Sequence, residues 1–153
     1  MSHAATVQTP SPASLRLDHQ VCFALYSASL AMTKRYKPLL DAIGLTYPQY
    51  LVMLVLWERD GVTVSALGER LFLDSGTLTP LLKRLESAGL ITRLRDTQDE
   101  RRVHVGLTPQ GQALSGLAER IPEALLEGSR CTLAELTGLT AQLKQLRDDL
   151  GQR

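Results

Sequence analysis

A thiol and several phenols lie near the start of this 153-residue chain. Cys22 lies in an apolar segment with helical spacing, which also carries Tyr26 and Tyr36, and Tyr47 follows just beyond it. Phenolic O–H groups can donate hydrogen bonds to a thiolate, which is the reactive form of cysteine. The only other cysteine, Cys131, could resolve an oxidised Cys22. The residues therefore suggest a redox-sensing pair, Cys22 and Cys131, with the three tyrosines as candidate hydrogen-bond donors.

Spacing restricts how these groups can meet. Cys22 and Tyr36 are about 21 Å apart on one continuous helix, at 1.5 Å per residue. They cannot touch within one chain unless the segment folds back, but an antiparallel partner subunit could bring them together. Tyr26, one turn after Cys22, could approach it within the same chain. The alternative is that Cys22 is an inert core residue, which is common for free cysteine.

Composition limits the class of protein. A chain of 153 residues, 44% apolar and 22% charged, fits one globular domain with one core. The net charge is only +1, so any contact with DNA must depend on local charge. No apolar run could span a membrane, and the N-terminus does not resemble a signal peptide. We therefore expect a cytoplasmic protein with no membrane partner, in which a disulfide is a transient signal.

Catalytic and metal sites are not predicted. His3, His19 and His104 lack metal-ligand spacing. The chain has no glycine-rich phosphate loop, catalytic triad or paired carboxylates. We expect no metal, no cofactor and no enzymatic activity.

The two ends of the chain have apolar helical stripes. Residues 1–14 predict a disordered arm, and residues 15–153 predict a single domain. From Leu15 the apolar face is wide enough to need cover on more than one side. Pro38 marks an end or a kink in this helix.

A second stripe occupies the C-terminal tail. The tail is helical by pattern from Thr108 to Leu150, with an interruption near residues 128–132. A partner subunit could supply part of the cover that these two apolar stripes need.

The middle of the chain, residues 46–107, changes from helical to strand spacing. Thr46 followed by Pro48 predicts a helix start, and Thr63 predicts another. A further helix follows the break at residues 73–76, and two short strands span residues 91–95 and 101–107. Helix, turn, helix and hairpin in this order predict a winged helix-turn-helix. The expected fold is mostly α with a small β-hairpin wing.

The second helix of this pair has a polar face. Leu78, Leu82 and Leu85 share one side of a helical wheel, and hydroxyls and cations occupy the rest. Such groups suit base edges and phosphates, although a solvated helix face is the alternative. The start of this helix is open, because Pro80 fits either a kinked helix from Ser75 or a helix that begins at Thr79. The candidate DNA-binding residues in this helix are Ser75, Thr77, Thr79, Lys83 and Arg84.

The hairpin concentrates arginines. Asp99 could hold Arg101 in place across the turn while an arginine reaches a narrow minor groove. An exposed turn with weak surface ion pairs is the alternative. The candidate DNA-binding residues in the hairpin are Arg93, Arg95, Asp99, Arg101 and Arg102.

These motifs together resemble the MarR family. The resemblance covers about residues 15–150 and is carried by Leu67-Gly68-Glu69-Arg70-Leu71, by residues 74–86 (DSGTLTPLLKRLE), by Gly89-Leu90-Ile91-Thr92-Arg93, by Asp99-Glu100-Arg101-Arg102 and by residues 107–111 (LTPQG). It implies a winged-helix repressor that dimerises through its N- and C-terminal helices, at residues 15–45 and 108–150. It also implies that Asp99 structures the wing and that Arg101 reaches DNA. Within the family, residues 18–26 and 45–50 resemble the organic hydroperoxide resistance repressors. That resemblance implies a peroxide-sensing cysteine at Cys22, hydrogen-bonded by Tyr36 and Tyr47.

The function expected from the sequence is a redox-sensing repressor. It binds inverted-repeat operator DNA as a homodimer when reduced. Organic hydroperoxides release it by oxidising Cys22, which then forms an intersubunit disulfide with Cys131. One alternative is a repressor of the same fold released by a small phenolic or hydrophobic ligand. The other is a thiol peroxidase, which would consume many equivalents of peroxide.

Overall fold

The computed structural model of the chain describes residues 12–151. Two short 3-10 turns, Ala13–Leu15 and Leu17–His19, precede the first helix, α1, at Val21–Asp41. A helix beginning at Leu15 is therefore a wrong prediction. The side-chain amide of Gln20 donates to the carbonyls of Ser14 and Arg16, which helps to hold the turns in place of a helix. The predicted disordered arm lies largely outside the described residues, and its last two residues, 13 and 14, belong to the first turn.

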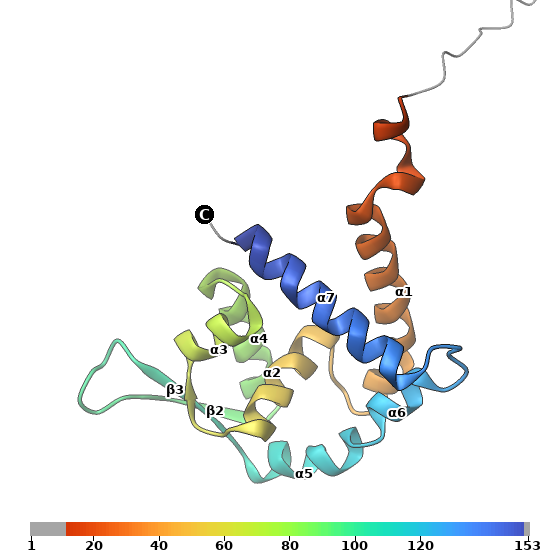
Figure 1. Cartoon of the computed structure of the whole chain (residues 1–153). Coiled ribbons are helices and arrows are strands. Elements are labelled where there is room, and N and C mark those ends of the chain that lie inside the picture. The colour runs from red at the N-terminus through yellow and green to blue at the C-terminus, as the bar shows by residue number, and fades with distance from the viewer. Residues whose placement is uncertain (1–11, 152–153) are drawn as a thin grey trace, which may run out of the picture.

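Figure 1 shows the N-terminal half of α1 extending away from the rest of the chain at the upper right, and the β-hairpin projecting at the left. No helix among residues 12–151 is long and apolar enough to cross a membrane. The remaining elements are α2 (Tyr47–Glu58), β1 (Val62–Thr63), α3 (Val64–Leu71), α4 (Ser75–Ser87), β2 (Ile91–Arg95), β3 (Val103–Leu107), α5 (Pro109–Ala118), α6 (Ile121–Leu126) and α7 (Leu133–Gly151).

The helices of the central region begin at side-chain caps. Thr46 forms a reciprocal capping box with Gln49 at the start of α2. Thr63, Asp74 and Thr108 each accept a hydrogen bond from the backbone three residues later, at the starts of α3, α4 and α5. These caps satisfy N–H groups that have no partner within a helix, and they fix where each helix begins. The predicted helix starts at Thr46, Thr63 and Thr108 agree with the structure.

Helix α4 begins at Ser75 and contains Pro80 in its interior. Of the two starts left open by the sequence, the structure has the earlier one. Pro80 cannot donate the hydrogen bond that would reach the carbonyl of Gly76. The cap at Asp74 accepts from Thr77 at 2.8 Å, and the Thr79 hydroxyl donates to the Ser75 carbonyl at 2.7 Å. These two local contacts support the first turn that proline would otherwise weaken.

The sheet has three antiparallel strands in the order β1-β3-β2. Ile91 pairs with Leu107 and Arg95 with Val103, which defines the wing. The wing strand begins at Val103 rather than at Arg101, because Arg101 and Arg102 lie in the turn. Strand β1 was not predicted, since two residues are too short to show a period. The buried apolar core is formed by Leu40, Leu45, Tyr50, Val52, Met53, Leu56, Leu67, Leu78, Leu82, Leu85, Leu90, Ile91, Val105, Ala118, Ile121 and Leu125.

The C-terminal tail is divided into three helices. The predicted interruption near residues 128–132 is present between α6 and α7. A second break, between Ala118 and Ile121, was not predicted, and Pro122 in the first turn of α6 fits a fresh helix start. Gly111 in α5 is tightly packed, because a Cβ there would overlap the carbonyl oxygen of Leu90. The side chain of Trp57 donates to the Gly111 carbonyl at 3.0 Å, which ties α5 to α2.

Candidate functional site

Cys22 is the second residue of α1 and is exposed as a free thiol. Gln20 precedes the helix without making a side-chain cap, so the first-turn N–H groups have no side-chain acceptor there. The thiol therefore lies at the end of α1 where the backbone N–H groups have no partner within the helix. This placement in the first turn follows from the late start of α1. The sequence pattern had placed Cys22 well inside a helix.

The tyrosines form a cluster at the other end of α1. The rings of Tyr36 and Tyr47 lie 4.8 Å apart between centroids, and Tyr36 lies 5.9 Å from Tyr50. Burial, with smaller contributions from Tyr47 and Tyr50, raises the pKa of Tyr36 to about 12. Burial also raises the pKa of Tyr47. Both phenols therefore keep their protons at neutral pH, and both remain hydrogen-bond donors.

The thiol and this phenol cluster are separate within one chain. Tyr36 lies on the same continuous helix as Cys22, about 21 Å along its axis. Tyr26 lies one turn from Cys22 and is exposed. Tyr50, which the sequence analysis missed, is buried in the core beneath the cluster. Its aromatic type alone does not distinguish it from an ordinary core residue.

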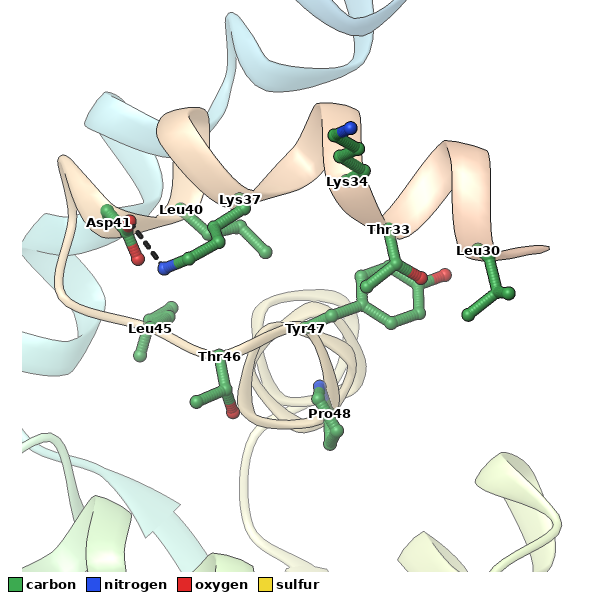
Figure 2. A pocket seen from close by; sticks show the side chains of 10 residues that line it. All are labelled: Leu30, Thr33, Lys34, Lys37, Leu40, Asp41, Leu45, Thr46, Tyr47 and Pro48. Carbon is green, nitrogen blue, oxygen red and sulfur yellow. Dashed lines mark hydrogen bonds and ion pairs between the residues drawn. The ribbon is translucent and has the colours of Figure 1, made fainter. Parts of the chain in front are cut away.

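A cavity of about 520 Å³ opens between the second half of α1 and the start of α2. Figure 2 shows Tyr47 beneath α1, with its hydroxyl directed toward the Thr33 and Leu30 end of the cavity. Lys37 and Asp41 form an ion pair at 2.8 Å at the other end. The complete lining is Leu30, Thr33, Lys34, Lys37, Leu40, Asp41, Leu45, Thr46, Tyr47 and Pro48.

Cys131 is exposed and free in the segment before α7. Its backbone N–H donates to the Ser129 hydroxyl at 3.0 Å. Thr132 and Glu135 then form reciprocal contacts that cap α7. The Arg35 guanidinium donates to the Glu127 carbonyl at 2.6 Å, so the segment before Cys131 is tied to α1.

Large apolar side chains are exposed along α1 and α7. Helix α7 has no buried residue, and only Leu40 is buried in α1. In an isolated chain these surfaces would leave a large apolar area in water, which is typical of an interaction surface. The exposed apolar residues of these two helices and of the turns before α1 are Leu15, Leu17, Val21, Phe23, Tyr26, Leu30, Met32, Leu133, Leu139, Leu143 and Leu150.

Helix α4 presents its predicted polar residues to solvent. Its leucines at positions 78, 82 and 85 are buried, whereas Lys83 and Arg84 are exposed. Ser75 and Thr77 are exposed in its first turn. Thr79 is half-buried and directs its hydroxyl proton to the Ser75 carbonyl, so it can only accept from an external partner.

The wing holds Asp99 and Arg101 in the predicted relation. The Arg101 Nε donates to Asp99 at 3.0 Å and a terminal nitrogen donates at 3.3 Å. These contacts hold the pKa of Asp99 below its usual value. The Arg101 side chain is nevertheless 90% exposed, so it is oriented but still available to a partner.

The other wing arginines differ in whether they are bound to other residues of the chain. Arg93 makes two hydrogen bonds to Glu86, at 3.1 and 2.6 Å, and joins the wing to α4. Arg95 and Arg102 are exposed. Arg93 is therefore held within the chain, whereas the other two remain accessible.

The turn end of the wing contains a pair that sequence analysis missed. Asp96 accepts from the backbone of Gln98 at 2.8 Å and lies 3.0 Å from the His104 ring. The Gln98 and His104 contacts lower the pKa of Asp96 to about 2. The same carboxylate, helped by the Gly61 carbonyl, raises the pKa of His104. The sequence showed His104 only as a histidine without metal-ligand spacing, because its pairing with Asp96 has no sequence signature.

Comparison with known proteins relates this arrangement to transcriptional regulators. Residues 34–116 match the family described as transcriptional regulator SarA/Rot. The chain is 49% identical over 139 residues to the organic hydroperoxide resistance transcriptional regulator of Bacillus subtilis, covering 91% of this chain and 95% of that protein.

Two solved structures of AbfR of Staphylococcus epidermidis have the same fold. Reduced AbfR bound to DNA is 37% identical, has a TM-score of 0.74, and matches 90% of this chain and 95% of that one. Disulfide-formed AbfR is 36% identical, has a TM-score of 0.64, and matches 92% and 95% of the two chains. The present conformation is therefore more similar to the reduced, DNA-bound chain than to the disulfide-linked one.

Proposed function

The chain belongs to the SarA/Rot family of transcriptional regulators, and we propose that it senses organic hydroperoxides through Cys22 and releases operator DNA when this thiol is oxidised. The resemblance to MarR-type winged-helix regulators, and to the organic hydroperoxide resistance group among them, is confirmed. The protein is a redox-sensing, DNA-binding repressor and not an enzyme. It acts as a homodimer on DNA, and a cytoplasmic location is part of the proposal.

The observation that carries the proposal is that the thiol and the phenols are far apart along α1. Cys22 lies exposed in the first turn, and the phenols of Tyr36 and Tyr47 lie near the opposite end. A two-fold partner whose α1 runs antiparallel would place each thiol beside the other subunit's phenols. The exposed apolar faces of α1 and α7 supply the surface for such a dimer. The sensor would then lie across the interface, so its oxidation would act on subunit geometry directly.

The chemistry follows from this arrangement. The Cys22 thiolate attacks the outer oxygen of the hydroperoxide, the O–O bond breaks, and the alcohol leaves after taking a proton. Sulfur is oxidised to a sulfenic acid while the hydroperoxide is reduced. The Cys131 thiol of the other subunit then attacks this sulfur, and water leaves as the disulfide forms. The cavity beside Tyr47 would hold the organic part of the hydroperoxide, because its lining is largely apolar.

Titration tests this function. DNA affinity should be followed by fluorescence anisotropy on a duplex selected by the reduced protein from a random-sequence pool. Release should be complete near about one equivalent of cumene hydroperoxide per Cys22, and dithiothreitol should restore binding. Release that needs a large excess of peroxide, or that dithiothreitol does not reverse, would contradict the proposal.

A second function, release by a phenolic or hydrophobic ligand, is favoured by the same cavity. Its volume of about 520 Å³ lies within the range of small-molecule sites. A phenolic compound that released DNA equally from wild type and from Cys22→Ser would support this alternative.

Replacing Arg101 by alanine should weaken DNA binding without unfolding the protein. The guanidinium is oriented by Asp99 but is otherwise in solvent, so its removal takes no packing from the core. Losing one arginine contact typically costs about 1–3 kcal/mol of binding free energy. Anisotropy at fixed salt measures the loss, and Arg16→Ala, outside the winged helix-turn-helix, is the matched control. Equal affinity of wild type and Arg101→Ala would remove Arg101 from the interface.

Replacing Tyr36 and Tyr47 by phenylalanine should slow the oxidation of Cys22. The substitution removes only the hydroxyls, so the ring packing at 4.8 Å can be kept. A hydrogen bond to a charged group contributes about 1.5–3 kcal/mol, which predicts an oxidation rate lower by about tenfold or more. Stopped-flow measurement of sulfenic acid formation gives the rate. Tyr26→Phe tests the third phenol in the same way, and an unchanged rate in the double variant would contradict the role of the phenol cluster.

A further inference from the structure

Phe72 has a backbone conformation that its residue type disfavours. It follows α3 with φ of +57°, and among residues 12–151 it is the one non-glycine residue with positive φ. The N–H of Leu73 bonds the Gly68 carbonyl and the N–H of Phe72 bonds the Glu69 carbonyl, which is a Schellman ending of the helix. Glycine is the usual residue at this position. A phenylalanine here gains nothing for the backbone, so its side chain must supply the reason.

The Phe72 ring does not pack in the core. It is 67% exposed. The guanidinium carbon of Arg147 lies 4.2 Å from the ring centroid, in the geometry of a cation–π contact. Asp148 accepts two hydrogen bonds from Arg147, at 2.9 and 2.8 Å, and so fixes the plane of the guanidinium. The ring therefore serves a contact between α7 and the turn of the helix-turn-helix.

The two residues of this contact connect different functional parts of the chain. Phe72 lies two residues before Asp74, the cap that fixes the first turn of α4. Arg147 lies near the end of α7, and Cys131 lies two residues before that helix begins. Leu133 and Arg147 are about 21 Å apart along the helix axis. Since α7 has no buried residue, its own chain does little to hold it against a displacement.

We propose that the stack of Arg147 on Phe72 couples the position of α7 to the position of α4, so that a disulfide at Cys131 is transmitted to the DNA-binding helix. This inference rests on the proposed function. In the reduced protein the stack holds the start of α4 in place. When the disulfide displaces α7, the stack breaks or pulls on the turn at Phe72, and the first turn of α4 moves. Phe72 and Arg147 are positioning residues and do not react.

Variants of both residues test the coupling. Arg147→Ala removes the cation, and Phe72→Gly removes the ring and relieves the backbone. Phe72→Tyr keeps the ring, and Lys144→Ala removes a cation from the same helix about one turn earlier. Each protein is measured in two states, reduced and disulfide-linked, on the duplex selected with the reduced wild type. The readouts are the ratio of the two affinities, the extent of covalent dimer on a non-reducing gel, and the thermal midpoint.

We expect the loss of DNA affinity on oxidation to become smaller, while formation of the disulfide is unchanged. Arg147→Ala and Phe72→Gly should form the disulfide normally. The ratio of reduced to disulfide-linked DNA affinity should fall about fivefold for each stack that is lost, and each subunit of the dimer has one, as the strength of a cation–π contact implies. Phe72→Tyr and Lys144→Ala should keep the wild-type ratio. Phe72→Gly should not lower the thermal midpoint, since glycine suits this conformation.

Two outcomes would overturn the inference in different ways. If Arg147→Ala weakened the reduced and oxidised forms equally and left the ratio unchanged, the stack would be merely structural and the coupling would be wrong. If the wild type itself formed the disulfide without losing affinity, the proposed function would fail, and the coupling with it.

Discussion

A Cys22→Ser variant should bind DNA as tightly as the reduced wild type and should remain bound when an organic hydroperoxide is added. Serine is similar in size, and residue 22 is exposed, so no packing is lost in the chain itself. Its hydroxyl does not ionise near neutral pH and cannot take the oxygen of the peroxide. The wild type should lose affinity by about 5- to 150-fold, the usual range of allosteric coupling. The variant should lose none.

The matched control for this experiment is Cys131→Ser, which removes the other exposed thiol and leaves Cys22 to react. Anisotropy titrations of both variants, with and without cumene hydroperoxide, make the comparison. If hydroperoxide released Cys22→Ser as fully as wild type, the sensor would be elsewhere in the molecule. The apolar cavity beside Tyr47 would then become the leading site of regulation.

Spacing along a helix was the most reliable sequence information about the sensor. The separation of Cys22 and Tyr36 depends only on their being on one helix, and α1 satisfies that condition. The sequence could not show where α1 begins. Apolar residues recur with helical spacing before Val21, but hydrogen bonds from Gln20 to the preceding turn end that pattern. The late start changes the position of the sensor, because Cys22 moves from a helix interior to a first turn.

Contacts between residues that are distant in sequence were not predictable. Tyr50 completes the aromatic cluster through tertiary packing, and nothing in its local pattern marks it. His104 meets Asp96 because β2 and β3 pair in one particular register. The stack of Arg147 on Phe72 joins residues 75 positions apart. In contrast, Asp99 and Arg101 are two residues apart, and their contact follows from a short turn.

The recognition helix shows a conflict that sequence reasoning could state but not resolve. Pro80 disfavours a helix from Ser75, whereas the cap at Asp74 favours it. The structure has the capped helix, with the Thr79 hydroxyl bonded to the Ser75 carbonyl. One lost backbone hydrogen bond was therefore outweighed by two local ones and by the burial of the three leucines on its inner face.

A Cys131→Ser variant should respond to peroxide at Cys22 but should form no covalent dimer. Both thiols are exposed and free in the present chain, and a disulfide requires their Cα atoms to come within about 7 Å. Two-fold symmetry permits two Cys22–Cys131 bonds in each dimer. Without Cys131 the sulfenic acid has no thiol to condense with. It should persist under mild oxidation and proceed to sulfinic acid at higher peroxide.

Mass spectrometry and non-reducing gels distinguish these products. Wild type treated with hydroperoxide should migrate as a covalent dimer that dithiothreitol reverses, and Cys131→Ser should migrate as a monomer with one or two added oxygens on Cys22. A covalent dimer that persists in Cys131→Ser would indicate a bond between two Cys22 residues, and an oxidised wild type that stays monomeric would exclude the intersubunit bond. In either case the tether from Cys131 to α7 would be lost, and DNA release would have to arise at the start of α1 alone. Because Cys131 lies so close to the start of α7, only the predicted pairing lets one oxidation event displace α1 and α7 together.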